Sequence, residues 1–437
     1  MTDLEEYRRR ARAWLEANTR DLPPDPDLAT ARAFMARLHD AGYSGITWPT
    51  AYGGQGLSAA EERAFQQAAR DLTLPIGVFG IGLGMCGPTL LSLGTEEQKR
   101  RYLPPLLRGE EIWCQLFSEP GAGSDVASLQ TRAVRDGDCW VVNGQKVWTS
   151  VARQADLGLL IARTDPDVPK HRGITMFIVD MHAPGVTVRP LRDMTGEAHF
   201  NEVYFDDVRI PADRVVGEVN GGWRAAVTTL LHERVSIGTG AARTERPASF
   251  AAVSRAARER GLLADPAVRD RLVDLYLRER AFDLFNARLA QEVKAGIDPG
   301  ARGSVAKLLL AELTLDSAGI AAEILGPRAV AYGGHGEGRI ARALSWAPGM
   351  ALGGGTNEIM RNIIGDRVLG LPREPQVDRD VPFRDLKVGT QAKRADAERP
   401  AAKDTGGKDT GGKDAGGMDT GGKDAGETGA GAKEAGR

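Results

Sequence analysis

Residues 117–150 read FSEPGAGSDVASLQTRAVRDGDCWVVNGQKVWTS, and within this stretch the chain changes from helical to β patterning. It opens with a glycine-containing turn and continues with two short alternating runs, LQTRAVRDG and CWVVNG, which meet at an Asp-Gly turn. Alternation with a period of two, interrupted by turn residues, is typical of β-strands. Similar runs follow up to about residue 220. Because no helix long enough for a parallel crossover lies between consecutive runs, the pattern favours a sandwich or barrel over a doubly wound sheet.

The segments on either side of this β region have helical patterning. On the N-terminal side, residues 7–18, 28–41 and 59–72 are amphipathic or alanine-rich, and Thr95 with Gln98 forms a capping-box pattern that predicts the start of a further helix. On the C-terminal side, long helical patterns predict a bundle. Their ranges are 222–241, 248–261, 266–295, 303–325 and 356–368.

We therefore expect an α+β chain of four parts. These are a helical N-terminal domain (residues 1–110), a middle β domain (111–221), a C-terminal helical bundle (222–372) and a tail (373–437). The tail repeats a five-residue unit close to KDTGG that has no apolar position, so nothing in it offsets the entropy of ordering. It is predicted to be disordered, either as a dispensable low-complexity segment or as a tether for a partner.

Composition limits the classes of function. The net charge of −2 over 437 residues provides no overall field for nucleic acid or an anionic membrane. No apolar stretch approaches the roughly 20 residues of a membrane span, and the N-terminus lacks a secretory signal, so we expect a cytoplasmic protein. Cys86, Cys114 and Cys139 stand far apart, and the histidines lack ligand spacing. Neither a disulfide framework nor a metal site is expected, so redox chemistry would need an organic cofactor.

Two segments have the residue types that bind a flat or anionic ligand. The turn at Pro120, Gly121 and Gly123 exposes backbone amides without side chains in the way, although it could equally be an ordinary turn between secondary-structure elements. Trp148 offers an aromatic face, followed by the hydroxyls of Thr149 and Ser150, although on its own it would more often be a core residue at a strand end.

Three segments resemble the acyl-CoA dehydrogenase family. They are FSEPGAGSD (117–125), NGQKVWTS (143–150) and GGTNEIMRNIIGDRVLGLPR (354–373), and they occur in the family's order within a helical, β, helical arrangement. The resemblance implies a lipid-metabolic flavoprotein that uses FAD to oxidise an acyl thioester. It assigns FAD contacts to Gln115, Leu116, Phe117, Ser118, Gly123, Ser124, Trp148, Thr149, Ser150, Thr356 and Glu358. It assigns substrate contacts to Ser124, Arg234, Gly354 and Gly355.

The position of the catalytic base departs from the commonest family pattern. Many members have the catalytic glutamate where this chain has Gly354. A branch resembling the isovaleryl and long-chain acyl-CoA dehydrogenases supplies it from an earlier helix, in an L-x-E-R sequence that matches Leu231, His232, Glu233 and Arg234 here. The helical pattern places Glu233 at the border of the buried stripe, where a carboxylate can act as a general base. We therefore predict Glu233 as the residue that takes the α-proton, while the β-hydrogen leaves as hydride to the flavin and trans-2-enoyl-CoA forms.

Two other departures bear on assembly. Many homotetrameric relatives have R-x-x-F-G and Q-x-x-G-G segments, where this chain has RAARERGLL (255–263) and EILGP (323–327), with Glu323 in place of glutamine. By resemblance we expect a homo- or hetero-oligomer that passes electrons to an electron-transfer flavoprotein. Two alternatives stay open: a half-site or non-catalytic subunit of a heteromeric acyl-CoA dehydrogenase, and a flavin oxidase or monooxygenase on the same scaffold. The acyl chain, and whether its carrier is CoA or a protein, also stay open.

Overall fold

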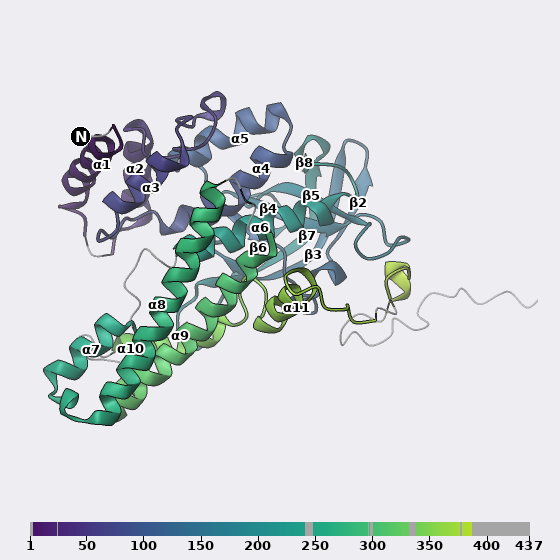
Figure 1. The fold of residues 1–437 in the computed structure, drawn as a ribbon. Helices are drawn as coiled ribbons and strands as arrows, with labels where there is room; N and C mark the ends of the chain where they lie inside the picture. The colour runs from purple at the N-terminus through teal and green to yellow at the C-terminus, as the bar shows by residue number, and fades with distance from the viewer. Residues whose placement is uncertain are drawn as a thin grey trace, which may run out of the picture. The chain divides into compact units, whose positions relative to one another are not determined.

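A computed structural model describes residues 3–23, 25–240, 248–295, 297, 300–331, 338–375 and 378–386, without the side chains of residues 234, 235, 237–240, 293 and 294. Along the chain, helices come first, a β-sheet follows and a second set of helices ends the described part (Figure 1). The predicted order of helical, β and helical parts is confirmed. The repeated part of the predicted tail lies outside the described residues.

The N-terminal part consists of five α-helices. They are α1 (Asp3–Thr19), α2 (Leu28–Asp40), α3 (Ala59–Ala68), α4 (Gly87–Leu93) and α5 (Glu96–Arg108). The predicted capping box is present at α5, where the Thr95 side chain accepts from the Gln98 amide and the Gln98 side chain accepts from the Thr95 amide. A π-helical turn, η3 (Gly82–Cys86), precedes α4.

The middle part forms one eight-stranded sheet. Its strands are β1 (Trp113–Leu116), β2 (Arg132–Asp136), β3 (Cys139–Ser150), β4 (Leu157–Arg163), β5 (Ile174–Asp180), β6 (Val186–Leu191), β7 (Phe200–Pro211) and β8 (Val215–Val216). The hydrogen-bonded order is β6-β7-β3-β2-β4-β5-β8, with β1 pairing parallel to β4. Strands β4 and β5 are buried along almost their whole length, which explains why they are apolar without alternation. Most other pairs are antiparallel, as expected for strands joined by short turns.

In the C-terminal part, the described residues form six α-helices. They are α6 (Gly222–Gly240), α7 (Phe250–Glu259), α8 (Pro266–Lys294), α9 (Gly303–Leu325), α10 (Gly338–Met350) and α11 (Asn357–Arg367). Helix α10 was not predicted, because Pro348 and Gly349 near its end weaken the helical pattern. Among the described residues, no helix combines the length and apolar character needed to cross a membrane.

Short helical turns connect these elements. They are η1 (Thr50–Tyr52), η2 (Gly77–Phe79), η4 (Val126–Ser128), η5 (Ala212–Arg214), η6 (Leu262–Ala264), η7 (Gly300–Arg302), η8 (Gly326–Val330) and η9 (Phe383–Asp385). The turn η9 falls within the range predicted as a disordered tail. The structure instead places Asp378–Leu386 in hydrogen-bonded contact with the loop between β4 and β5, because Phe383 finds a buried position there.

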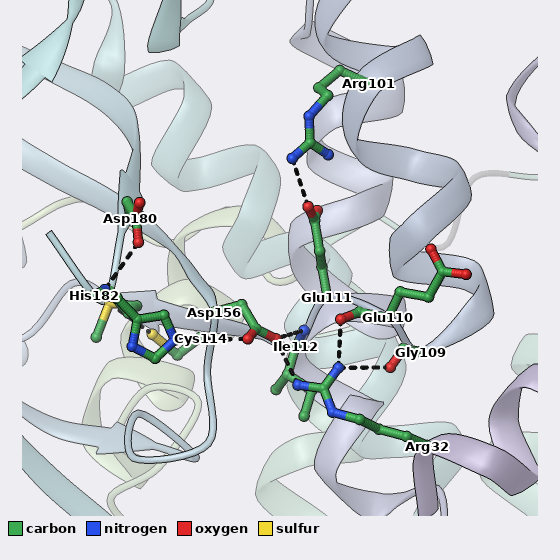
Figure 2. A network of polar contacts seen from close by, with 11 residues as sticks. Arg32, Arg101, Gly109, Glu110, Glu111, Ile112, Cys114, Asp156, Asp180 and His182 are labelled. Carbon is green, nitrogen blue, oxygen red and sulfur yellow. Dashed lines mark hydrogen bonds and ion pairs between the residues drawn. The ribbon is translucent and has the colours of Figure 1, made fainter. Parts of the chain in front are cut away.

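A polar network fixes the N-terminal helices to the start of β1 (Figure 2). Arg32 on α2 donates to the backbone carbonyls of Gly109 and Glu110 and forms a 2.8 Å ion pair with Asp156. Asp156 in turn accepts from the backbone amide of Ile112 at 2.8 Å. One guanidinium therefore joins α2, the α5–β1 connection and the turn before β4, and so fixes the strand that carries Gln115.

Candidate active site

Strand β3 has an irregular, strained end at Trp148. The β3–β7 register shifts between Lys146 and Thr149, and Trp148 has a φ of 60°. A non-glycine residue in the left-handed region costs about 1–2 kcal/mol, and such strain is concentrated at functional sites. Trp148 is 56% exposed and packs on Phe200 in a T-shaped geometry, with ring centroids 5.7 Å apart. The bulge thus turns a large aromatic side chain outward, where its face can stack on a flat ligand.

The residues beside Trp148 leave buried polar atoms unpaired. Thr149 is 2% exposed, and its carbonyl accepts from the Asn201 side-chain amide at 2.9 Å. Among the described residues, the Thr149 hydroxyl and the Asn201 side-chain oxygen are both buried without a hydrogen-bond partner. Each such group costs roughly 1–3 kcal/mol. An isoalloxazine ring, with polar atoms along its edge and an aromatic face, matches these two groups and the adjacent indole, so the residues present fit a flavin.

A buried ion pair ties the turn after β1 to this end of β3. The fully buried ammonium of Lys146 donates to the Phe117 carbonyl at 2.9 Å and to the Glu119 carboxylate at 2.8 Å. The Val147 amide donates to the Ser118 carbonyl at 2.9 Å. Burial lowers the pKa of Lys146, and Glu119 opposes this shift. Burial would raise the pKa of Glu119, but Lys146 and further hydrogen bonds outweigh it and hold that pKa below its ordinary value.

The predicted flavin-contact residues of this turn differ in what they can offer. The side chains of Leu116 and Phe117 are buried in the core, so only their backbone could reach a ligand. Gly123 and Ser124 are exposed, and a Cβ added at Gly123 would meet nothing within 4 Å. The backbone of this turn is therefore open to a ligand at its tip and anchored by Lys146 at its base.

The predicted base lies beside β1. The side-chain amide of Gln115 donates to the Glu233 carboxylate at 3.3 Å, which joins β1 to α6. The Gln115 side-chain oxygen is buried without a hydrogen-bond partner among the described residues. Burial lowers the pKa of the neighbouring His232. The side chain of Arg234 lies outside the described residues, so its predicted substrate contact stays a prediction.

A buried lysine connects the base to the glycine-rich turn before α11. Lys307 on α9 is 2% exposed, and its ammonium lies 3.4 Å from the Asn357 side-chain oxygen. Burial lowers the pKa of Lys307, and the carboxylates of Glu358 and Glu233 oppose that shift. Both carboxylates therefore lie within electrostatic reach of one cation. The contact with Asn357 puts this cation beside the residue that follows the GGT segment, Gly354–Thr356.

The GGT segment itself has left-handed backbone geometry. Gly354 and Gly355 have φ values of 69° and 91°, and a Cβ added at Gly355 would lie 2.6 Å from the Met360 methyl carbon. Thr356 caps α11, and its hydroxyl accepts from the Ile359 amide at 3.2 Å. Glu358, with its side chain 77% exposed, lies in the first turn of that helix. The helix N-terminus thus faces outward with an amide-rich turn before it, a geometry that suits phosphate.

An aromatic row links the sheet to the bundle at this site. Phe200, beside Trp148, stacks on Trp346 of α10 with centroids 5.9 Å apart and planes 4° from parallel. Sequence reasoning missed Lys146, Asn201, Lys307 and Trp346. Lys146 lies inside the NGQKVWTS motif, where its charge between strand residues was a usable signal. The other three have no local signal, because their partners come from distant parts of the chain.

Family models match three consecutive parts of the chain. They describe the N-terminal domain of acyl-CoA dehydrogenases over residues 1–110, the middle domain over 114–208 and the C-terminal domain over 220–369. The chain belongs to the acyl-CoA dehydrogenase family. The predicted family, fold class and FAD cofactor are confirmed, as is the enzyme class, an oxidoreductase that acts on the CH–CH group of an acyl-CoA.

Named relatives and solved structures support this membership. The acyl-CoA dehydrogenase IpdE1 of Mycobacterium tuberculosis is 38% identical over 86% of this chain and 99% of that protein. The acyl-CoA dehydrogenase FadE34 of the same organism is 42% identical over 80% of this chain, which spans only 48% of that relative's length.

Two solved structures are similar along nearly the whole of their own chains. The Tcur3481-Tcur3483 steroid ACAD and the ChsE4-ChsE5 complex from Mycobacterium tuberculosis are each 34% identical, covering 86% of this chain and 99% of theirs, with TM-scores of 0.74 and 0.70. The second of these structures is a complex of two proteins.

Proposed function

We propose that this protein dehydrogenates an acyl-CoA thioester between its α and β carbons, with Glu233 as the base. The observation that carries the proposal is the hydrogen bond from Gln115 to Glu233. It puts the carboxylate of α6 beside the strand that leads directly into the flavin-binding turn. A base beside this strand would lie near the turn proposed to contact the flavin.

Each part of the site has one task in this reaction. Glu233 takes the α-proton, and Gln115 orients its carboxylate through the 3.3 Å hydrogen bond. Bound FAD supplies the acceptor for the β-hydrogen, which leaves with its electron pair as hydride. The substrate thereby loses two electrons and two hydrogens and becomes a trans-2-enoyl-CoA.

Backbone amides can stabilise the negative charge that develops on the thioester oxygen. The amides of Gly354 and Gly355 donate no hydrogen bond to another described residue. Two preorganised donors near an enolate oxygen stabilise the charge that forms when the α-proton is removed. The missing glutamate at position 354 therefore does not remove the donor that this turn contributes.

The FAD contacts are proposed on the fit of individual groups. Trp148 offers a ring face, Thr149 and Ser150 offer polar groups at the ring edge, and Gly123 and Ser124 offer open backbone. Thr356 and Glu358 lie at the N-terminus of α11, which favours a pyrophosphate. Asn201 is added to the predicted set because its side-chain oxygen is buried and unpaired beside Thr149.

For the acyl group and the assembly we infer a bulky, steroid-derived acyl-CoA and a heteromeric enzyme. The support is the similarity to a structure titled as a steroid ACAD and to the ChsE4-ChsE5 complex. Glu323, which stands where many homotetrameric relatives have glutamine, forms a 2.6 Å ion pair with Arg271 of this chain. An electron-transfer flavoprotein is the proposed electron acceptor, and the cytoplasm is the proposed location.

The test is anaerobic flavin bleaching. The purified chain, alone and co-expressed with candidate partner subunits, is scanned for flavin absorbance and then mixed with straight-chain, branched and steroid-derived acyl-CoAs. We expect bleaching by an acyl-CoA and slow reoxidation in air. Flavin only in the co-expressed complex would favour the half-site subunit, and rapid reoxidation with peroxide formation would favour the oxidase. A flavin that no acyl-CoA reduces would refute the proposal.

A further inference from the structure

The segment Asp378–Leu386 packs on the loop that joins β4 and β5. The Phe383 amide donates to the Val168 carbonyl at 2.9 Å, and the Arg384 amide donates to the Pro166 carbonyl at 3.0 Å. The Phe383 side chain is 7% exposed and lies against the guanidinium of Arg163, 3.8 Å from the ring centroid. The segment follows the part of the chain that matches the family's C-terminal domain. We call Asp378–Leu386 the C-terminal strap.

One path of contacts leads from the strap through Lys170 to residues 117–124, which we call the flavin-binding turn. The Lys170 ammonium forms 2.9 Å ion pairs with Asp378 of the strap and with Asp125, the residue after Ser124. Asp125 also accepts from the Ser128 hydroxyl at 2.5 Å. Burial works to lower the pKa of Lys170, but the two carboxylates outweigh it and raise that pKa. The cation thus stays charged and holds two carboxylates from distant parts of the chain together.

A second path leads through Arg163, which the Phe383 ring covers. The Arg163 guanidinium donates to the Ala127 carbonyl and to the Lys170 carbonyl, each at 2.6 Å. Arg163 is 4% exposed, and burial lowers its pKa to about 10. The Phe383 ring adds a cation–π contact to the two hydrogen bonds that hold this guanidinium. Both paths end within residues 125–127, directly after the turn that carries Gly123 and Ser124.

We propose that the C-terminal strap positions the flavin-binding turn, with Asp378 and Phe383 as positioning residues that act through Lys170 and Arg163. This inference rests on the proposed role of Gly123 and Ser124 in FAD binding. Gly123 and Ser124 at the tip of that turn are exposed, so the strap would fix its C-terminal end while Lys146 fixes its start. Without the strap, FAD must order the turn when it binds, which weakens affinity.

A matched pair of single substitutions tests the path through Lys170. Asp378→Asn removes the ion pair that reaches Asp125. Arg384→Gln removes a more exposed 2.8 Å ion pair of the same strap, with Asp167, which does not reach the turn. With apoprotein titrated with FAD, we expect the Kd to rise about threefold for Asp378→Asn, the range of one partly exposed ion pair. Arg384→Gln should leave the Kd unchanged, and Asp378→Glu should restore it.

A matched pair of truncations tests the whole strap. A chain ending at Leu386 keeps the strap, and a chain ending at Pro375 lacks it. We expect the shorter chain to bind FAD at least about tenfold more weakly than the longer one. Amide exchange of residues 119–128, measured without FAD, should be faster in the shorter chain, a readout that does not depend on the flavin site.

The outcomes separate failure of this inference from failure of the proposed function. If the parent chain and its complexes bind no FAD, the proposed function fails, and exchange of residues 119–128 alone decides on the strap. Equal exchange and equal FAD affinity in the two truncations would overturn the inference. If the shorter chain does not fold, equal behaviour of Asp378→Asn and Arg384→Gln would overturn it instead.

Discussion

Replacing Glu233 with glutamine tests the catalytic proposal most directly. Glutamine keeps the length of the side chain and can still accept the 3.3 Å hydrogen bond from Gln115, so the position of the group should be preserved. It cannot take a proton. Loss of a general base slows a reaction by roughly 10²–10⁴-fold, and a hundredfold corresponds to about 2.7 kcal/mol in the barrier.

The assay is anaerobic stopped-flow reduction of the flavin by an acyl-CoA that bleaches the parent enzyme. We expect the Glu233→Gln enzyme to bind FAD and acyl-CoA with near-parental affinity and to reduce its flavin at least about a hundredfold more slowly. Glu6→Gln, an exposed carboxylate on α1 that pairs with Arg9, is the matched control and should reduce at the parental rate. Reduction of Glu233→Gln at the parental rate would refute the reasoning, because the base would then lie elsewhere or in a partner subunit.

Substitutions at four residues probe the flavin site and its surroundings. Trp148→Ala should weaken FAD retention while the melting temperature changes little. The side chain is 56% exposed, so the loss of roughly 3–5 kcal/mol that is typical of a core truncation does not apply. Normal flavin content after gel filtration would contradict the assignment of Trp148 to the flavin site. Lys146→Met should destabilise the fold by about 3–5 kcal/mol in urea unfolding, since it leaves Glu119 as a buried, uncompensated charge, and an unchanged midpoint would contradict this. The pKa of Glu119 is lower in the folded protein than in the unfolded chain, where it is about 4.3. Its contribution to the free energy of unfolding is therefore present above that unfolded pKa and is lost as the pH falls below it. Glu119→Gln should consequently make the free energy of unfolding depend less on pH in the acid range. Lys307→Met should reduce FAD retention, because the contact with Asn357 and the cation near Glu233 and Glu358 are lost, whereas Lys307→Arg should retain part of it.

The sequence predicted what depends on local patterns. The capping box at Thr95, the alternating strands and most of the long helices were foreseen, because each has its signal within a few residues. The contact between Gln115 and Glu233 joins residues 118 positions apart, and Lys307 lies 50 positions from Asn357. No local pattern contains such pairs. The roles of Asn201 and of the C-terminal strap were not predicted for the same reason, because they depend on contacts with residues that are distant in the sequence.

The β-bulge at Trp148 shows how the site departs from local rules. Strand patterning alone would place Trp148 on one face of a regular strand, more often in the core, whereas the family resemblance assigns it to the FAD site. The shifted register and the positive φ turn the indole outward instead, next to two buried polar atoms that lack partners among the described residues. Strain and unpaired groups are both costly, so their coincidence at one strand end points to a ligand that offsets them.

The geometry of the GGT segment gives a physical reason for the base on α6. Gly354 has a φ of 69°, so a glutamate at this position would have to adopt the left-handed region at a cost of about 1–2 kcal/mol. The same chain has a carboxylate on α6 that accepts a hydrogen bond from Gln115 and that opposes the lowering of the pKa of the buried Lys307. A Gly354→Glu substitution in the Glu233→Gln background should therefore recover little activity. The substitution would strain the turn that presents the amides of residues 354 and 355, and the new carboxylate would lack the partner that Gln115 provides.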